Sequence, residues 1–227
     1  MPTTEKTRLK ASPVEVEYRD PSSGVIRRDT LTGDTVVGLT QIFSYMPQMA
    51  SLLPVVIDEA DHGRYAPLMA LAQMMTREMG GQMNRAMQWS VICSEDADRY
   101  RADPADADTV LGADVAGAFF AACRNWPHGQ RPEDFNKPLQ SQVPALLLSG
   151  EIDPVTPPPY GEAVLKGLPN GRHLVLRGQG HNVSGVGCLP KLVGQFLETT
   201  DARKLDAKCL DAIGYVPPFT GFNGWEP

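Results

Sequence analysis

The feature that most constrains the fold is a pattern of strand, loop and helix that occurs twice in the second half of the chain. The first strand is the apolar run 143–149, and Thr156-Pro157 then gives the N-cap and first-turn signal of a helix over about 158–167. The second strand is 172–176, and the amphipathic stretch 189–198 is its helix. This order of elements predicts a parallel sheet and an α/β fold class.

The chain upstream of this pattern has mostly helical spacing and little strand character. We expect residues 1–12 to be a frayed, disordered tail, residues 13–137 to be a mostly helical cap or lid, and residues 138–227 to be the α/β segment with an irregular tail from 214. Within the cap, the patterns predict a hairpin over 13–31 and a β-compatible run Met87–Cys93. They predict helices from Asp34, as the cap, through about Phe43, over 65–79 and over 113–123. An apolar stretch runs from Ser51 to near Gly63, and an acidic loop or short helix is expected over 97–112.

Charge and composition argue against several classes of function. With 21 Lys and Arg against 27 Asp and Glu, the net charge of −6 disfavours nucleic-acid binding, because that requires a basic surface. No apolar run is long enough to cross a bilayer, and the N-terminal residues lack the apolar segment of a signal peptide. The four cysteines, Cys93, Cys123, Cys188 and Cys209, form no CxxC pair, so neither a metal site nor a cofactor is expected. Three disulfide pairings are open to them, and buried free thiols are the alternative.

Two titratable residues follow the two predicted strands. Asp153 lies in SGEIDPVTP and His181 lies in RGQGHNVSG, each just past its strand. The carboxyl ends of parallel strands meet at one edge of a sheet, which is where sites form in α/β folds. A histidine that acts as a general base needs a carboxylate to fix its tautomer, and the chain order Asp then His is that of the α/β-hydrolase triad. We therefore interpret Asp153 and His181 as catalytic.

The sequence around these residues resembles a known family. PALLLSGEIDPVTPP, GRHLVLRGQGHNVSGVGC and a further cysteine at 209 are similar to the C-terminal region of tripeptidyl-aminopeptidase-like α/β-hydrolases, serine exopeptidases related to proline iminopeptidases. Upstream, RYAPLMALA, WSVICSED and CRNWP resemble the cap of that family, so the resemblance extends over about 13–213. It implies a partial α/β-hydrolase fold with a helical cap.

The resemblance also implies disulfides and substrate contacts. It pairs Cys93 with Cys123 and Cys188 with Cys209, which favours a periplasmic or secreted full-length protein. It implies a peptide substrate with a free N-terminus, whose ammonium group requires an anion. Glu95 is the first candidate for that anion and Asp96 the second, with a solvated acidic loop as the alternative. Thr156 resembles a family position close to the catalytic Asp, although a helix N-cap accounts for it equally well. The other histidines, His62, His128 and His173, are expected to be surface or structural residues.

The nucleophile expected of such an enzyme is missing from this sequence. None of the ten serines lies in a GxSxG context, and no HGGG-like oxyanion segment occurs. We therefore expect the C-terminal portion of a serine exopeptidase that is inactive alone: a gene fragment, a frameshift product, or one piece of a split enzyme whose partner is a separate N-terminal half with the nucleophile. Such a portion leaves sheet edges uncovered and is expected to be poorly soluble or to dimerise. The alternatives are a non-catalytic binding or assembly subunit of the same fold, and an esterase, which would not need the carboxylates near residue 95.

Overall fold

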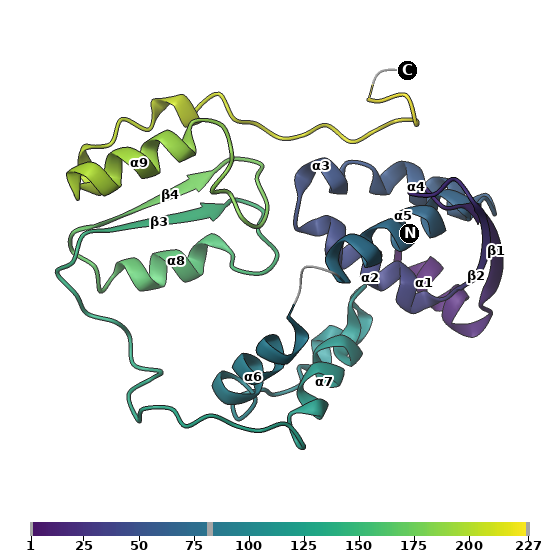
Figure 1. Ribbon diagram of the computed structural model, residues 1–227, viewed down its shortest axis with the longest axis horizontal. Helices are drawn as coiled ribbons and strands as arrows, with labels where there is room; N and C mark the ends of the chain where they lie inside the picture. The colour runs from purple at the N-terminus through teal and green to yellow at the C-terminus, as the bar shows by residue number, and fades with distance from the viewer. Residues whose placement is uncertain (1, 81–83, 226–227) are drawn as a thin grey trace. The chain divides into compact units, whose positions relative to one another are not determined.

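The computed structural model describes residues 2–80 and 84–225, and it divides into two compact units (Figure 1). The first unit comprises the chain through Gln41 together with Val56–Asn136. The second comprises Ile42–Val55 and Lys137–Pro227, so a short upstream segment belongs with the α/β part of the chain. The sequence suggested a single division near residue 137, whereas tertiary contacts also place residues 42–55 in the second unit.

The first unit begins with a helix and a hairpin. The N-terminal residues, expected to be frayed, instead form α1 (Pro2–Ala11), because Leu9 is fully buried in the unit and holds the helix in place. Strands β1 (Val14–Arg19) and β2 (Ile26–Leu31) pair antiparallel, which confirms the predicted hairpin. On β1 the buried residues alternate with exposed ones, so one face of the hairpin packs on the core.

The hairpin turn contains a fully buried carboxylate, that of Asp20. It accepts hydrogen bonds from the backbone amides of Ser22 and Ser23, both at 3.0 Å, and pairs with Arg27 at 2.9 Å and Arg77 at 2.7 Å. Burial raises the pKa of Asp20, but the hydrogen bonds from Ser23 and Ser22 and the charge of Arg77 outweigh it and lower the pKa to about 2.

Replacing Asp20 with Asn should make the free energy of unfolding depend less on pH in the acidic range. Because the folded-state pKa is depressed, the carboxylate stabilises the fold above the unfolded pKa of about 4, and this contribution is lost as the pH falls toward about 2. Thermal unfolding between pH 7 and pH 2 measures the effect. Asp20→Asn should have a lower midpoint at pH 7 and a smaller drop below pH 4 than the wild type. Asp61→Asn, which changes an exposed carboxylate, is the matched control, and equal slopes for the two variants would contradict the prediction.

The helices that follow the hairpin belong to both units, since residues 42–55 are part of the second. The predicted helix at Asp34 begins one residue earlier, so Asp34 lies in its first turn, where its charge favours the positive helix end. The hydroxyl of Thr32 instead accepts the hydrogen bond from the amide of Thr35. The helices of this region are α2 (Gly33–Ser44), α3 (Pro47–Ala50), α4 (Leu53–Asp61) and α5 (Ala66–Gly80).

The run Met87–Cys93 was expected to be β-compatible, and this prediction is wrong. These residues lie in helix α6 (Arg85–Glu95), which Asn84 caps by accepting a hydrogen bond from the amide of Met87 at 3.0 Å. A short apolar run does not distinguish a strand from a buried helix, and here the cap and tertiary packing decide. The short 3₁₀ turn η1 (Pro104–Asp108) and α7 (Gly112–Ala122) follow as predicted.

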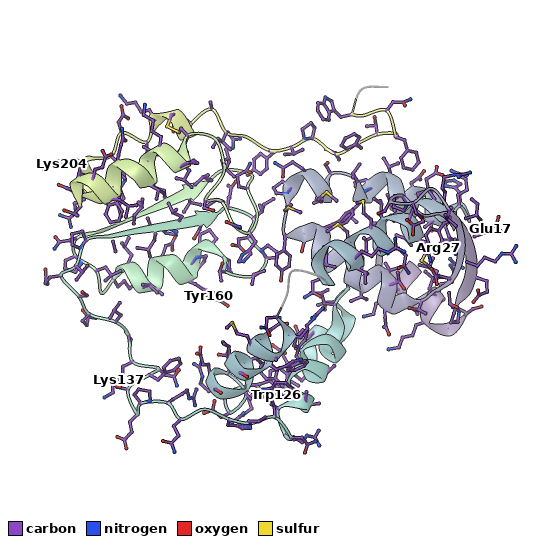
Figure 2. All side chains as sticks on the ribbon, viewed as in Figure 1. Glu17, Arg27, Trp126, Lys137, Tyr160 and Lys204 are labelled. Atoms are coloured by element: carbon purple, nitrogen blue, oxygen red, sulfur yellow. A yellow bond between two sulfur atoms is a disulfide. The ribbon has the colours of Figure 1, made fainter. Side chains whose placement is uncertain are left out.

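Helices α6 and α7 are joined by a disulfide and by aromatic contacts. Cys93 and Cys123 are bonded, which confirms this predicted pair. Trp89 packs on Phe119, with ring centroids 5.2 Å apart. Trp126, labelled in Figure 2, donates a hydrogen bond from its indole nitrogen to the hydroxyl of Ser90 at 3.2 Å.

The second unit contains the predicted β–α–β–α pattern. Strands β3 (Ala145–Gly150) and β4 (Gly171–Leu176) pair in parallel, with Ala145 opposite Gly171. Helix α8 (Pro158–Leu165) covers one face of this pair and α9 (Leu189–Thr199) the other (Figure 1). Two 3₁₀ turns follow, η2 (Ala202–Lys204) and η3 (Lys208–Leu210), and Cys188–Cys209 ties η3 to the start of α9, as predicted. The core under α9 consists of Leu174, Leu176, Val183, Leu189, Leu192 and Leu205.

None of the helices in the described part of the chain is both long and apolar enough to span a membrane. Within the same residues, no group of three or more His, Cys, Asp or Glu side chains is arranged to hold a metal ion.

Candidate active site

Two loops at the carboxyl ends of β3 and β4 form the candidate site. The loop after β3 carries Asp153 and the loop after β4 carries His181, and the parallel pairing of the strands brings both loops to one edge. Backbone hydrogen bonds extend the pairing into the loops, from the amide of Glu151 to the carbonyl of Leu176 and from the amide of Ile152 to the carbonyl of Gln179, both at 3.0 Å. The backbones that carry the two side chains are therefore joined.

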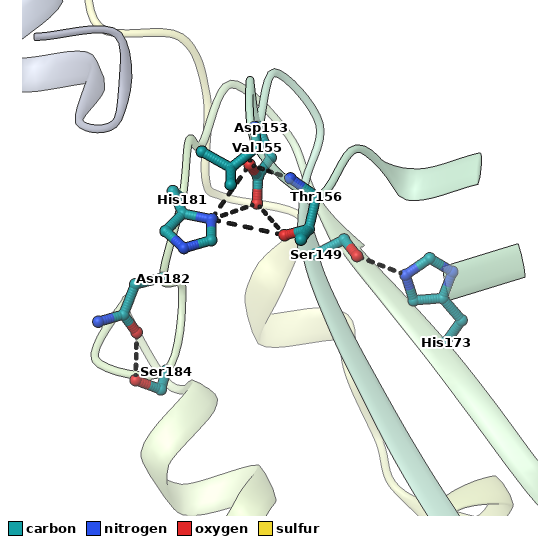
Figure 3. A network of polar contacts seen from close by, with 8 residues as sticks. All are labelled: Ser149, Asp153, Val155, Thr156, His173, His181, Asn182 and Ser184. Atoms are coloured by element: carbon teal, nitrogen blue, oxygen red, sulfur yellow. Dashed lines mark hydrogen bonds and ion pairs between the residues drawn. The ribbon is translucent and has the colours of Figure 1, made fainter. Parts of the chain in front are cut away.

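The side chains of Asp153 and His181 form a hydrogen-bonded pair (Figure 3). Nδ1 of His181 lies 3.0 Å from Oδ2 and 3.2 Å from Oδ1 of Asp153. The Asp153 side chain is almost fully buried, at 4% exposure, whereas the imidazole is 35% exposed. The two residues predicted from their loops therefore meet, with the carboxylate inside and the imidazole open to solvent.

Further donors hold the carboxylate of Asp153. Oδ1 accepts hydrogen bonds from the backbone amides of Val155 at 2.8 Å and Thr156 at 2.9 Å, and the Thr156 hydroxyl donates to Oδ2 at 3.0 Å. Burial raises the pKa of Asp153, but the amides of Thr156 and Val155, the imidazole and the Thr156 hydroxyl outweigh it, and the pKa lies below its ordinary value. Asp153 is therefore ionised at neutral and mildly acidic pH.

Ionisation of Asp153 determines which nitrogen of His181 carries the proton in the neutral ring. A carboxylate only accepts hydrogen bonds, so Nδ1 must be the donor. Nε2 then has its lone pair free, and it makes no hydrogen bond within the described residues. This is the tautomer that a general base requires.

Thr156 belongs to the site but does not cap α8, contrary to one of its two predicted roles. The N-cap position of α8 is Pro157, which has no side-chain capping hydrogen bond. The Thr156 hydroxyl is turned instead toward Asp153 and lies 3.4 Å from Nδ1 of His181. At an N-cap the hydroxyl would accept from a helix amide, whereas here it donates to an ionised carboxylate, and that charge-assisted hydrogen bond explains its orientation.

Tyr45 contacts the site although no sequence pattern predicts it. Its carbonyl oxygen accepts a hydrogen bond from the backbone amide of His181 at 2.7 Å, and its ring lies edge-on to the imidazole at a centroid distance of 5.3 Å. A Cβ atom on Gly180 would lie 2.3 Å from the same carbonyl oxygen, so this close approach requires glycine. Tyr45 is far from His181 in sequence, and only the fold shows that they are neighbours.

Two further polar contacts beside the pair complete the network in Figure 3. Asn182 has a left-handed backbone, with φ of 66°, and its side-chain oxygen accepts a hydrogen bond from the hydroxyl of Ser184 at 2.8 Å. On the α8 side, the hydroxyl of Ser149 lies 2.9 Å from Nε2 of His173. Burial lowers the pKa of His173 more than the charge of Glu162 raises it. The Ser149–His173 contact is inside the packing of α8 on the sheet, so it is a structural contact.

The candidate amine anchors lie in the first unit, at the end of α6. Asp96 lines a cavity of about 660 Å³, whose other walls include Gln88, Ile92, Phe119 and Phe120. Glu95 is not among the lining residues of that cavity. One oxygen of Asp96 pairs with Arg99 at 3.0 Å. Glu95 is the last residue of α6 and Asp96 is its C-cap with a non-helical backbone, so these neighbours in sequence differ in their access to the cavity.

Comparison with known proteins supports the family resemblance over part of the chain. Residues 108–209 match the family model described as TAP-like protein. The matched segment includes Asp153, Thr156, His181 and both cysteines of the Cys188–Cys209 bond. The small parallel sheet with helices on its two faces is compatible with part of an α/β-hydrolase. No curated protein and no solved structure matches the chain.

Proposed function

We propose that this chain, whose residues 108–209 belong to the tripeptidyl-aminopeptidase-like α/β-hydrolases, supplies the acid–base pair of a serine exopeptidase. The observation that carries this proposal is the hydrogen bond between a buried, ionised Asp153 and a partly exposed His181 whose Nε2 has no partner within the described residues. In this arrangement Nε2 takes the proton of a serine hydroxyl as its oxygen attacks the scissile carbonyl. Asp153 stabilises the resulting imidazolium, which then protonates the leaving amine.

The nucleophile is proposed to come from outside this sequence. None of the ten serines lies in a GxSxG context, and in the described part of the chain no serine hydroxyl contacts His181. The β3–β4 sheet has two strands, so each has an edge on which further strands can pair. We propose that an N-terminal half, on the same polypeptide or a separate one, carries the serine and extends this sheet.

The proposed substrate is a peptide with a free N-terminus, and Asp96 is the preferred anchor for its ammonium group. Asp96 lines the cavity of the first unit, and the aromatic walls there suit an apolar side chain next to the amine. The side-chain oxygen of Gln88, which also lines the cavity, is buried without a hydrogen-bond partner in the described part of the chain, so it would accept a donor from the substrate. Glu95, the first candidate from the sequence, becomes the second because it does not line the cavity.

The test uses the protein that includes the proposed nucleophile segment, with the isolated chain as the inactive control. Asp96→Asn should raise KM for aminoacyl-nitroanilides about tenfold or more, since a charge-assisted contact is lost, and should leave hydrolysis of simple esters unchanged. Glu95→Gln is the matched variant and should have the smaller effect. If both variants affect amines and esters equally, the amine anchor is wrong and the esterase alternative gains support. Hydrolysis by the pure, isolated chain would contradict an external nucleophile.

A non-catalytic binding or assembly subunit is the second candidate, and the lack of a GxSxG serine in this sequence favours it. The DNA immediately upstream separates the two functions. A GxSxG-encoding stretch there, in frame or frameshifted, supports the peptidase, whereas an intact unrelated gene supports the subunit. Under either function we propose an extracytoplasmic location, because two disulfides persist best in an oxidising compartment.

A further inference from the structure

The two loops of the candidate site are also joined by a side chain, the carboxylate of Glu151. Glu151 lies two residues before Asp153, and its Oε2 accepts a hydrogen bond at 2.8 Å from the backbone amide of Gly178, three residues before His181. The side chain of Tyr215 in the C-terminal tail also favours the ionised form of this carboxylate. A single carboxylate therefore joins the Asp153 loop to the His181 loop and interacts with the tail.

The backbone of Gly178 explains why this contact is needed. Gly178 has a left-handed conformation, with φ of 64°, which turns the chain away from the strand pairing. A Cβ atom there would lie 2.8 Å from both the carbonyl oxygen of Gly214 and the Cα of Tyr215, so the tail packs directly on the turn. Gly178 lies past the end of β4, so strand pairing does not provide an acceptor for its amide, and the Glu151 carboxylate accepts that hydrogen bond instead.

Neighbouring charges and rings keep the carboxylate ionised and in place. The hydrogen bond from the Gly178 amide and the influence of the Tyr215 side chain outweigh burial, and with the charge of Arg177 they lower the pKa of Glu151. The guanidinium of Arg177 lies over the ring of Tyr215, 5.2 Å from its centroid. The side-chain amide of Gln179 reaches the carbonyl of Gly214 at 3.5 Å, which adds a second tie between the tail and the His181 loop.

We propose that Glu151 is a positioning residue whose carboxylate, braced by Tyr215, fixes the two loops at the separation that the Asp153–His181 hydrogen bond requires. The inference rests on the proposed function, because positioning matters only if that pair is the acid–base pair. Glu151 touches neither side chain of the pair and acts through the loop backbones.

The test follows two signals in the full chain by NMR. Hydrogen exchange of the Gly178 amide reports the Glu151 contact itself, and the low-field proton resonance of His181 Nδ1 reports the bond to Asp153. Glu151→Ala should speed Gly178 exchange about tenfold, as loss of a charge-assisted hydrogen bond predicts, and should weaken the Nδ1 resonance about threefold or more. Glu151→Gln and Tyr215→Phe should show smaller changes in the same direction, because each keeps part of the contact. Glu198→Ala, which changes an exposed glutamate on α9, should change neither signal.

The thermal unfolding midpoint of each variant is measured as well, so that a global loss of structure can be recognised. Unchanged Gly178 exchange in Glu151→Ala would overturn the contact, and faster exchange with an unchanged Nδ1 resonance would overturn the positioning role. In both cases the proposed acid–base pair would still be supported if the His181 Nδ1 resonance is present in the wild type and is lost in Asp153→Asn. A wild-type chain that lacks the resonance would overturn both proposals together.

Discussion

Replacing Asp153 with Asn should lower kcat of the nucleophile-containing enzyme by about 10⁴-fold while the chain stays folded. The carboxylate is the acceptor that places the proton on Nδ1 of His181 and leaves Nε2 free. An amide at this position offers N–H groups as well as an oxygen, so it stabilises the wrong tautomer and cannot compensate the imidazolium charge. The loss should fall on kcat, since Asp153 is proposed to act on the imidazole rather than on the substrate.

Steady-state hydrolysis of aminoacyl-nitroanilides measures this effect. Asp211→Asn is the matched control, because it makes the same chemical change at an exposed aspartate of the same unit. Circular dichroism and the unfolding midpoint establish that Asp153→Asn is folded. A kcat within about tenfold of the wild type would contradict the assignment of Asp153 as the partner of a general base.

Removing the disulfides should produce the largest loss of stability. The bonded residues of Cys188–Cys209 are 21 apart in sequence and those of Cys93–Cys123 are 30 apart. Closing loops of these lengths lowers the entropy of the unfolded chain. This stabilises the fold by about 3 kcal/mol for Cys188–Cys209 and about 4 kcal/mol for Cys93–Cys123. Each bond lies within one unit, and Cys188–Cys209 anchors the segment that follows the His181 loop. Loss of that bond should therefore loosen the site as well as the fold.

Denaturant unfolding of the double variants Cys188→Ala/Cys209→Ala and Cys93→Ala/Cys123→Ala measures the two contributions. Reduction of the wild-type protein should reproduce the combined effect, and reductant should not further destabilise a variant with all four cysteines replaced. If each pair contributes less than about 1 kcal/mol, loop closure is not their main role. A chain that depends on both bonds would be poorly stable in a reducing compartment, in keeping with the proposed location.

The amino-acid sequence alone predicted the elements of the second half of the chain, where periodicity and helix signals agree. The apolar runs and helix signals from residue 143 onward predicted β3, α8, β4 and α9 within a few residues. These elements follow from hydrophobic periodicity and from the residues that start and end helices. The placement of Asp153 and His181 followed as well, since parallel strands necessarily bring their carboxyl ends together. The cysteine pairs came from family resemblance rather than from spacing.

Features that depend on contacts between residues distant in sequence became visible in the folded chain. Residues 2–11 form a helix because Leu9 is buried by the rest of its unit, and Met87–Cys93 is helical because contacts with α7 select one of the two conformations that the run allows. The Thr156 hydroxyl turned from the helix end to a buried carboxylate, and Tyr45 and Glu151 joined the site through backbone groups. Almost every residue carries the same backbone N–H and C=O groups, so the sequence does not indicate which of them will pair with a distant residue.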